Sequence, residues 1–345
     1  MIVSTLPSAP PLTGFLPATA RTVDRALVHR SSLSEVFLTD LRPEDDGFLA
    51  TAQLPRSHAY WGDHVLSPAS YDPVLLIEVC RQATLAGSHR FYGVPMDSKF
   101  ILTQQTLALT RPELLTIGTE PAVLLLRATV TERREKEGVV TGLDYALRLY
   151  ALPVGQDAED DGATELGTAE VGLRFRSPDS YADLRLRGRG GRAPRSTAQM
   201  PAAQQAFPAA PHLVGRQLAD NVVLSEPRPE KEGASATLRI AASHPSLFDH
   251  AQDHVPGMVL IEGARQLSLH TLRDQLGLAP ERLRVLGIRA AYQRFGELET
   301  PISLGTELPS AQDALLADQF EVLVKVYQDD QIITDLTVSV GRVAR

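Results

Sequence analysis

The chain has 345 residues, 43% of them hydrophobic and 22% charged, which is ordinary for a globular protein long enough for two domains. Its formal net charge of −8 argues against a nucleic-acid partner, because such proteins carry a strongly basic face. No apolar run is long enough to span a membrane, and the first twenty residues lack the basic start of a signal peptide. The single cysteine, Cys80, excludes an internal disulfide, so we expect a cytoplasmic protein.

The first half of the chain predicts strands around one long helix. Residues 1–23 are rich in Pro, Ser, Thr and Ala and predict a flexible arm. Two short strands are then expected at Val36–Leu38 and Ala50–Leu54. A loop at His58–Pro73 leads into a helix at Pro73–His89, and a series of strands follows at Phe100–Phe175. Gln156–Gly162 is an acidic loop within the last of these.

The second half predicts the same order of elements. Residues 179–211 form the expected linker, and they carry Arg185, Arg187, Arg189, Arg192 and Arg195. This basic cluster is either a solvated linker or a dock for an acidic carrier protein or a phosphate. Strands follow at Val222–Leu224 and Ala236–Ile240. A loop at His244–Pro256 then leads into a helix at Gly257–Leu276, and more strands are expected at Arg284–Val343.

The two halves are copies of each other. Leu27–His64 aligns without a gap on Leu213–His250, with 15 of 38 positions identical, including Arg30/Arg216 and His64/His250. The offset is 186 residues here and becomes 184 in the helices. The sequence therefore predicts two similar domains, at 24–178 and 212–345.

The helix of each copy combines apolar and charged residues. Gly257–Leu276 is apolar on nearly every face, which is typical of a buried helix, yet Glu262, Arg265 and Gln266 share one face. Glu78, Arg81 and Gln82 repeat this pattern. Buried charges are costly unless they are paired or face a cavity, so these faces are either catalytic or a structural ion pair.

One hydrophobic helix held against a curved antiparallel sheet is the hotdog arrangement. We therefore expect an α+β fold of two tandem hotdog domains, packed as a pseudo-dimer within the chain with their central helices side by side.

Several motifs resemble one family. His244–Gln266 (HPSLFDHAQDHVPGMVLIEGARQ), Phe91–Pro95 (FYGVP) and Gln293–Pro301 (QRFGELETP) resemble the A-factor biosynthesis family of actinobacteria. These are the γ-butyrolactone or butenolide signal synthases with two hotdog repeats. The resemblance implies transfer of a β-ketoacyl group from an acyl carrier protein or coenzyme A thioester to dihydroxyacetone phosphate. Ser98-Lys99-Phe100 departs from the His-Gln-Phe type of sequence expected there.

The buried polar faces also suggest roles for the helix residues, because the fold places this helix beside the thioester. Glu262 would be the general base if burial raises its pKa toward neutrality, and Arg265 would hold the acceptor phosphate or orient the carboxylate. Glu78 and Arg81 are their equivalents, and we favour the second copy as the main site. Backbone N–H groups near Gly257 would stabilise the oxyanion. The remaining predicted substrate-binding residues are Gln266, Gln82, His250, Arg294 and Lys99, the last two adding positive charge around a phosphate.

Other functions stay open at this point. The segment before Glu262 resembles hotdog dehydratases, but their His would fall at Phe248, whereas His250 lies twelve residues before Glu262. A thioesterase or dehydratase, or a non-catalytic acyl-lactone binder, is the alternative to a transferase. We expect no cofactor and no metal, since His250, Asp249 and His254 lack a standard metal spacing. A homodimer is one assembly that would suit the fold.

Overall fold

The computed structural model describes residues 18–153, 162–200, 207–308 and 317–343. Most of the predicted N-terminal arm and of the acidic loop Gln156–Gly162 lies outside the described residues.

The first repeat wraps six strands around one helix. Its strands are β1 (Leu38–Glu44), β2 (Gly47–Leu54), β3 (Lys99–Leu109), β4 (Ala122–Lys136), β5 (Val139–Leu152) and β6 (Thr164–Arg176). Helix α1 (Pro73–Tyr92) begins where the Asp72 carboxylate accepts the Val74 N–H and ends at Gly93, whose φ of 66° suits glycine. Its buried residues cover all faces as far as His89, as its sequence predicted.

The second repeat has the same order. Its strands are β7 (Leu224–Glu230), β8 (Gly233–Leu238), β9 (Leu283–Tyr292), β10 (Ser303–Glu307), β11 (Gln319–Gln328) and β12 (Gln331–Arg342). Helix α3 (Gly257–Leu276) ends at Gly277, again in the left-handed conformation. Unlike α1, it begins after Pro256 without any side-chain cap.

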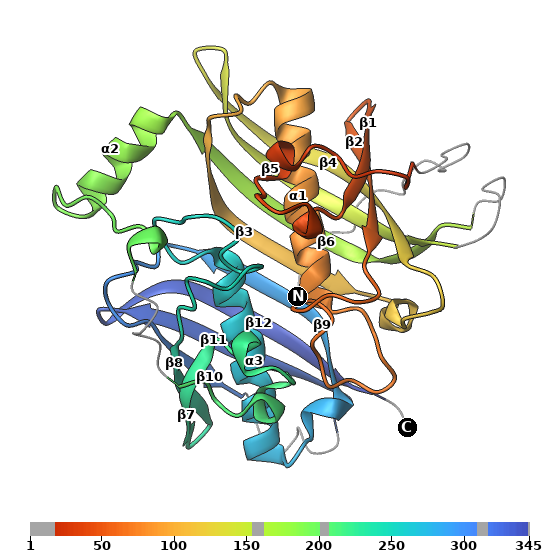
Figure 1. The fold of residues 1–345 in the computed structure, drawn as a ribbon, viewed down its shortest axis with the longest axis vertical. Coiled ribbons are helices and arrows are strands. Elements are labelled where there is room, and N and C mark those ends of the chain that lie inside the picture. The colour runs from red at the N-terminus through yellow and green to blue at the C-terminus, as the bar shows by residue number, and fades with distance from the viewer. Residues whose placement is uncertain (1–17, 154–161, 201–206, 309–316, 344–345) are drawn as a thin grey trace.

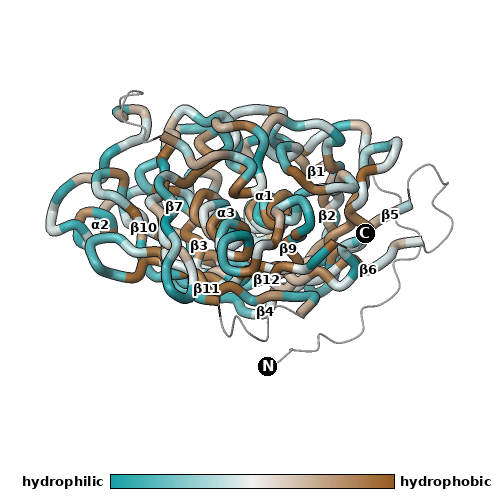
Figure 2. The backbone as a smooth tube through the Cα atoms, turned by 90° about the horizontal axis from the view of Figure 1, so that it is seen from below, coloured by the Kyte–Doolittle hydropathy of each residue, from teal (hydrophilic) through white to brown (hydrophobic). Residues whose placement is uncertain are grey.

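The two sheets join into one. The strand order is β1-β2-β4-β5-β6-β3-β9-β12-β11-β10-β8-β7, and β3 pairs antiparallel with β9 at the centre, with Thr106 opposite Arg289. Figure 1 shows α1 and α3 beside this continuous sheet, and Figure 2 shows them side by side when viewed from below. The predicted tandem hotdog fold and its pseudo-dimer packing are therefore confirmed. The helices run in opposite directions, so the start of each lies near the middle of the other.

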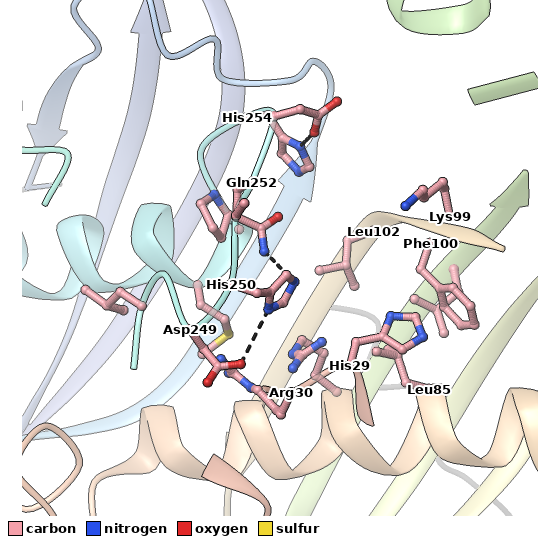
Figure 3. Close-up of a pocket in the computed structure, with 18 of the residues that line it drawn as sticks. His29, Arg30, Leu85, Lys99, Phe100, Leu102, Asp249, His250, Gln252 and His254 are labelled. Atoms are coloured by element: carbon pink, nitrogen blue, oxygen red, sulfur yellow. Dashed lines mark hydrogen bonds and ion pairs between the residues drawn. The ribbon is translucent and has the colours of Figure 1, made fainter. Parts of the chain in front are cut away.

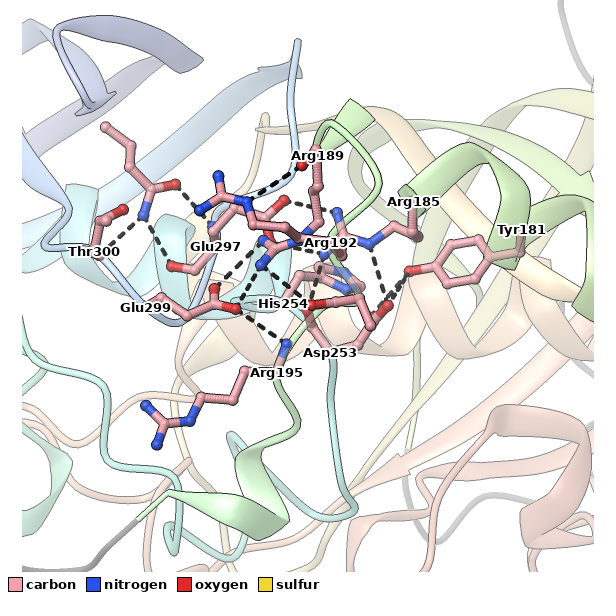
Figure 4. A network of polar contacts seen from close by, with 12 residues as sticks. Tyr181, Arg185, Arg189, Arg192, Arg195, Asp253, His254, Glu297, Glu299 and Thr300 are labelled. Atoms are coloured by element: carbon pink, nitrogen blue, oxygen red, sulfur yellow. Dashed lines mark hydrogen bonds and ion pairs between the residues drawn. The ribbon is translucent and has the colours of Figure 1, made fainter. Parts of the chain in front are cut away.

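The linker contains more structure than its composition predicted. Helix α2 (Pro178–Gly188) follows β6 directly, with Ser177 as its cap. Arg185 binds Asp253 and Glu297, and Arg189 binds Glu297 and Glu299, so α2 is fastened to the second repeat (Figure 4). These two arginines are therefore not a solvated or docking surface, because their guanidinium groups already hold carboxylates.

None of the helices in the described ranges is both long and apolar enough to cross a membrane.

Candidate active site

The carboxylate of α1 lies in a closed cluster of polar groups. Glu78 is fully buried and accepts hydrogen bonds from Arg81 at 2.7 and 2.8 Å, from Arg30 at 3.2 Å and from Gln82 at 2.7 Å. The amide oxygen of Gln82 accepts the Phe37 N–H at 3.0 Å. The buried charge is thus paired with two arginines and satisfied by hydrogen bonds.

The second helix repeats this cluster residue by residue. Glu262 is fully buried and accepts from Arg216 at 3.0 Å, from Arg265 at 3.0 and 2.6 Å and from Gln266 at 2.5 Å. Gln266 accepts the Val223 N–H at 3.0 Å. Arg30 and Arg216 are identical positions of the duplication, but the sequence interpretation did not connect them with the glutamates.

The environment of these carboxylates contradicts the pKa expected for a base. Burial alone would raise the pKa of the Glu262 carboxyl, but the charges of Arg216 and Arg265 and the hydrogen bonds outweigh burial and lower it to about 2. Glu78 is held at about 2 in the same way, with burial opposed by Arg30 and Arg81. The condition on which Glu262 would be the general base, a pKa raised by burial, is therefore not met. A carboxylate this enclosed, whose oxygens already accept hydrogen bonds from two arginines and a glutamine, cannot reach a substrate hydroxyl.

The clusters also lock the two repeats together. Arg30 donates to the Ser246 carbonyl in the loop of the second repeat, and Asp249 in that loop accepts the Ser31 and Ser32 N–H groups. The same contacts occur in reverse, since Arg216 donates to the carbonyls of Tyr60 and Asp63. Each polar cluster is therefore part of the interface between the repeats.

One large pocket opens between the middle of α1 and the start of α3. Its volume is about 440 Å³, and residues of both repeats line it, including Arg81, Lys99, His250 and Gly257. His250 reaches in from the loop before α3, with Asp249 and Gln252 on either side of its ring (Figure 3). A composite site of this kind is typical of an interface between two hotdog units.

The symmetry-related pocket is almost closed. It lies between the middle of α3 and the start of α1 and has a volume of only about 20 Å³. Four residues of the open pocket have different counterparts here: His29, Lys99, Pro256 and Gly257 correspond to Gly215, Leu283, Asp72 and Pro73. The two pockets have diverged, so only the first offers room for a ligand.

The structure separates residues that the sequence had placed in one site. Arg265 lines the closed pocket, whereas Gly257 from the same helix lines the open one. The residues predicted to form one site on the second copy are thus divided between the two pockets. The reason is that the helices run antiparallel, which brings Gly257 next to Arg81 of the first copy. The fully buried glutamates and glutamines, namely Glu78, Glu262, Gln82 and Gln266, are not among the lining residues of the described pockets.

Arg294 lies elsewhere than predicted. It is exposed and lines a second pocket of about 280 Å³, which adjoins the open one. The two pockets share Phe100, Leu102, His254 and Gly257. The second is lined mainly by apolar and aromatic side chains such as Leu260 and Phe295. An apolar chain could therefore lie in this second pocket with its end at Gly257. Arg294 thus lines the adjoining pocket and not the one that contains Lys99, and its role in substrate binding stays a prediction.

The open pocket has more positive charge available than its counterpart. In the closed pocket, Asp72 lies 3.8 Å from Arg216 and adds a second carboxylate to that cluster. The equivalent position in the open pocket is Pro256, which has no charge. Lys99 adds a further cation. The two carboxylates of the lining, Asp249 and Asp253, are already bound, Asp249 by the Ser31 and Ser32 N–H groups and Asp253 by Arg185. An anionic ligand would satisfy these groups.

Comparison with known proteins agrees with this geometry. The model of the A-factor biosynthesis hotdog domain matches residues 13–157 and 197–343. The chain belongs to the A-factor biosynthesis family. A relative from Streptomyces virginiae, named 2-oxo-3-(phosphooxy)propyl 3-oxoalkanoate synthase, is 33% identical over 90% of this chain and 95% of its own length. A relative with the same name from Streptomyces griseus is 27% identical over 91% of this chain and 93% of its own length. Another, from Streptomyces coelicolor, is 32% identical over 82% of this chain and 81% of its own length.

Solved structures share the fold at low sequence identity. The GphF dehydratase 1 structure is 12% identical, has a TM-score of 0.52, and matches over 96% of this chain and 100% of its own. This likeness concerns the fold alone. In this member of the A-factor biosynthesis family, Phe248 is buried at the position of the dehydratase histidine, while His250 contacts Asp249 and Gln252.

Within the described ranges, no group of three or more His, Cys, Asp or Glu side chains is arranged to hold a metal ion. Asp253 and His254, which line the pocket, are bound to each other at 2.6 Å, and Asp253 is also bound by Tyr181 and Arg185 of α2 (Figure 4).

Proposed function

We propose that the chain is an acyltransferase that moves a β-ketoacyl group from an acyl carrier protein or coenzyme A thioester to the free hydroxyl of dihydroxyacetone phosphate. The relatives' name describes such a product, an ester of a 3-oxoalkanoate with a phosphooxy-oxopropyl group. The proposal extends that activity to this chain and assigns it to the open pocket.

The observation that carries the proposal is the junction of a cationic pocket with an apolar one at Gly257. A phosphate suits the cationic side, since guanidinium and ammonium groups form charge-assisted hydrogen bonds with it. The acyl chain suits the apolar side, where burial of its methylene groups provides binding energy. The reacting carbonyl and hydroxyl would then meet beside the start of α3.

Arg81 and Lys99 are the proposed phosphate ligands. Arg81 uses Nε and Nη2 to hold Glu78, and its Nη1 has no hydrogen-bond partner among the described residues. The Arg81 side chain is 15% exposed, whereas that of Glu78 is fully buried. Glu78 therefore fixes the orientation of a guanidinium that still has two N–H groups to offer.

The start of α3 is the proposed oxyanion site. Its first N–H groups have no acceptor within the helix, and no side chain caps them. At the matching start of α1, Asp72 occupies this position. Gly257 and Met258 both line the open pocket, so their N–H groups and the positive end of the helix would stabilise a tetrahedral oxyanion.

The finer assignments are also proposals. We propose a cytoplasmic location, which the single, buried and unpaired cysteine supports. We keep both carrier protein and coenzyme A as donors, and a homodimer as a further level of assembly.

The test is to incubate the protein with a β-ketoacyl thioester and dihydroxyacetone phosphate, and to analyse the products by mass spectrometry. A phosphorylated ester, or the butenolide derived from it, is the expected product. Free β-keto acid as the main product would identify a thioesterase, and a dehydrated acyl thioester formed from a β-hydroxyacyl substrate would identify a dehydratase. Binding without turnover of either donor would identify an acyl-lactone binder.

A further inference from the structure

His29 occupies a position that favours glycine. It lies at the end of a short 3-10 helix (Arg25–Val28) with φ 54° and ψ 49°, in the left-handed region. The matching residue of the second repeat is Gly215, with φ 75°. A histidine in this conformation is uncommon, and strained backbone clusters at functional sites. The open pocket has His29 in its lining, whereas the closed one has Gly215.

Hydrogen bonds determine which nitrogen of His29 carries its proton. Nδ1 of His89 lies 2.8 Å from the Val94 carbonyl oxygen, so it must be the protonated nitrogen of that ring. Nε2 of a neutral His89 is then an acceptor, and Nε2 of His29, at 2.8 Å, donates to it. Nδ1 of a neutral His29 is left with a free lone pair, and it has no partner among the described residues.

The surroundings keep this ring neutral. Burial lowers the pKa of His29 to about 3, and the charges of Arg81, His89, His250 and Lys99 lower it in the same direction. These groups face His29 from α1, from the loop before α3 and from the start of β3. The ring also packs edge-on against Phe100, with centroids 4.8 Å apart. His29 is thus uncharged and oriented before substrate binds. The phosphate of a bound acceptor would offset the charges of Arg81 and Lys99 and so raise the pKa of His29 toward the range of a base.

We propose that His29 is the general base of the acyl transfer, with His89 as the positioning residue that fixes its tautomer. This inference rests on the proposed function. Nδ1 of His29 takes the proton of the acceptor hydroxyl as its oxygen bonds to the thioester carbonyl carbon. The C–S bond of the tetrahedral intermediate then breaks, and the His29 imidazolium returns the proton to the leaving thiolate. The products are the ester and the free thiol, so the proton is conserved.

Two other histidines, His250 and His254, line the open pocket. Nδ1 of His254 lies 2.6 Å from Asp253, which leaves Nε2 as a second candidate base, and loss of activity in His254→Ala with near-full activity in His29→Gly would assign the step to His254 instead. His250 is less suited to this step. Nε2 of His250 lies 2.8 Å from the side-chain nitrogen of Gln252, which donates to it, and Nδ1 faces Asp249. Both ring nitrogens are therefore engaged. His250 can still contact substrate, but its lone pair is already used.

The experiment compares ester formation by wild-type protein and by His29→Gly, with and without added imidazole. Glycine is the residue of the second repeat at this backbone conformation, so the variant is expected to fold. We expect kcat/KM to fall by about 10²–10⁴-fold, mainly in kcat. Added imidazole should restore part of the rate, because it can occupy the vacated space. His212→Ala, an exposed histidine outside the pocket, is the control for unspecific effects of imidazole.

A second pair of variants tests the relay. His89→Phe removes the acceptor for Nε2 of His29 and should lower kcat by about tenfold or more. His89→Gln keeps an acceptor oxygen and should retain more activity. Nitrogen-15 NMR of the wild-type side chains should show His29 protonated on Nε2 only, down to about pH 5.

The outcomes are distinct. His29→Gly with at least a third of the wild-type kcat/KM, or a slow variant that imidazole does not rescue, would overturn the base assignment. If His29→Gly does not fold, His29→Asn replaces it, because asparagine tolerates the left-handed conformation. An NMR signature of an Nδ1-protonated His29 would overturn the relay whatever the activity. No ester formation by the wild-type protein would instead refute the proposed function.

Discussion

Two buried glutamates, Glu78 and Glu262, connect the helices of this protein to its loops. Each carboxylate accepts hydrogen bonds from two arginines and one glutamine, and the second arginine of each cluster also binds the other repeat. A buried carboxylate with this set of partners stabilises the arrangement of the elements around it. Removing one partner leaves two guanidinium groups without compensation in a water-poor environment.

Glu262→Gln is therefore expected to destabilise the protein without removing its activity. Loss of one partner of a buried charge cluster costs roughly 3–5 kcal/mol. We expect a lower denaturation midpoint in urea, with a turnover per folded molecule within about threefold of wild type, since Glu262 does not line the open pocket. A stable Glu262→Gln protein with activity reduced 100-fold would restore the general-base role predicted from the sequence.

His29 gives stability a pH dependence with a defined sign. Its folded-state pKa is about 3, below the ordinary value of 6.5, so between these values the unfolded chain binds a proton that the folded chain does not. Stability is therefore lost as pH falls below 6.5, by about 1 kcal/mol from His29 alone between pH 6.5 and 5.5. His29→Gly should show a smaller loss in urea unfolding over this range. Equal losses in the two proteins would contradict a neutral, buried His29.

At the scale of elements, the two helix starts have taken different roles. Asp72 caps α1 through the Val74 N–H, and the following Pro73 removes one further donor. In α3, Pro256 and Gly257 replace them, so the first N–H groups stay available beside a cavity. An uncapped helix start is costly in a structural element and useful at a site where negative charge develops.

Gly257→Ala tests this use of α3. A Cβ atom at this position would lie 2.8 Å from the hydroxyl oxygen of Tyr292, whose ring would have to move at the junction of the two pockets. The backbone conformation itself permits alanine. We expect kcat/KM to fall about tenfold or more, with little change in the free energy of unfolding. Gly118→Ala, where a Cβ atom meets nothing within 4 Å, is the matched control.

An unchanged rate for Gly257→Ala, measured with saturating and with limiting thioester, would show that the acyl carbonyl does not approach this helix start.

The duplication made most of the fold predictable. Matched motifs indicated a duplication, and in each copy an all-round apolar helix followed by several strands indicated a helix buried against a sheet. The site was only partly predictable. Arg81, Lys99, His250 and Gly257 do meet in one pocket, but antiparallel helix packing sends Arg265 to the other. Spacing along a helix cannot reveal which residues face each other across an interface.

The sequence did not indicate His29, because the two repeats were compared at their identical positions and His29 is a position at which they differ. The one signal in the sequence is a histidine opposite a glycine, His29 against Gly215, within an otherwise well matched segment. Lys99 opposite Leu283 and Pro256 opposite Asp72 are differences of the same kind. In a duplicated chain with one open pocket, such differences mark the active side better than the shared residues do, since the shared residues maintain the common fold.

At the scale of the whole molecule, the chain is an internal dimer that has kept one of two equivalent pockets open. The continuous twelve-stranded sheet and the reciprocal arginine contacts hold both halves together. The closed pocket, of about 20 Å³, leaves no space for a substrate, whereas the open one, of about 440 Å³, joins an apolar channel. We therefore expect a single site, with a cationic end for a phosphate.

The most direct test of this claim is the ratio of kcat/KM for dihydroxyacetone phosphate to that for dihydroxyacetone, with one β-ketoacyl thioester as donor. Charge-assisted hydrogen bonds of roughly 1.5–3 kcal/mol each predict a preference on the order of 100-fold for the phosphorylated acceptor. Lys99→Ala should reduce this ratio by about tenfold, and Arg265→Lys, at the closed pocket, should leave it unchanged. Equal use of both acceptors by the wild-type protein, or a ratio that depends on Arg265 and not on Lys99, would contradict the account.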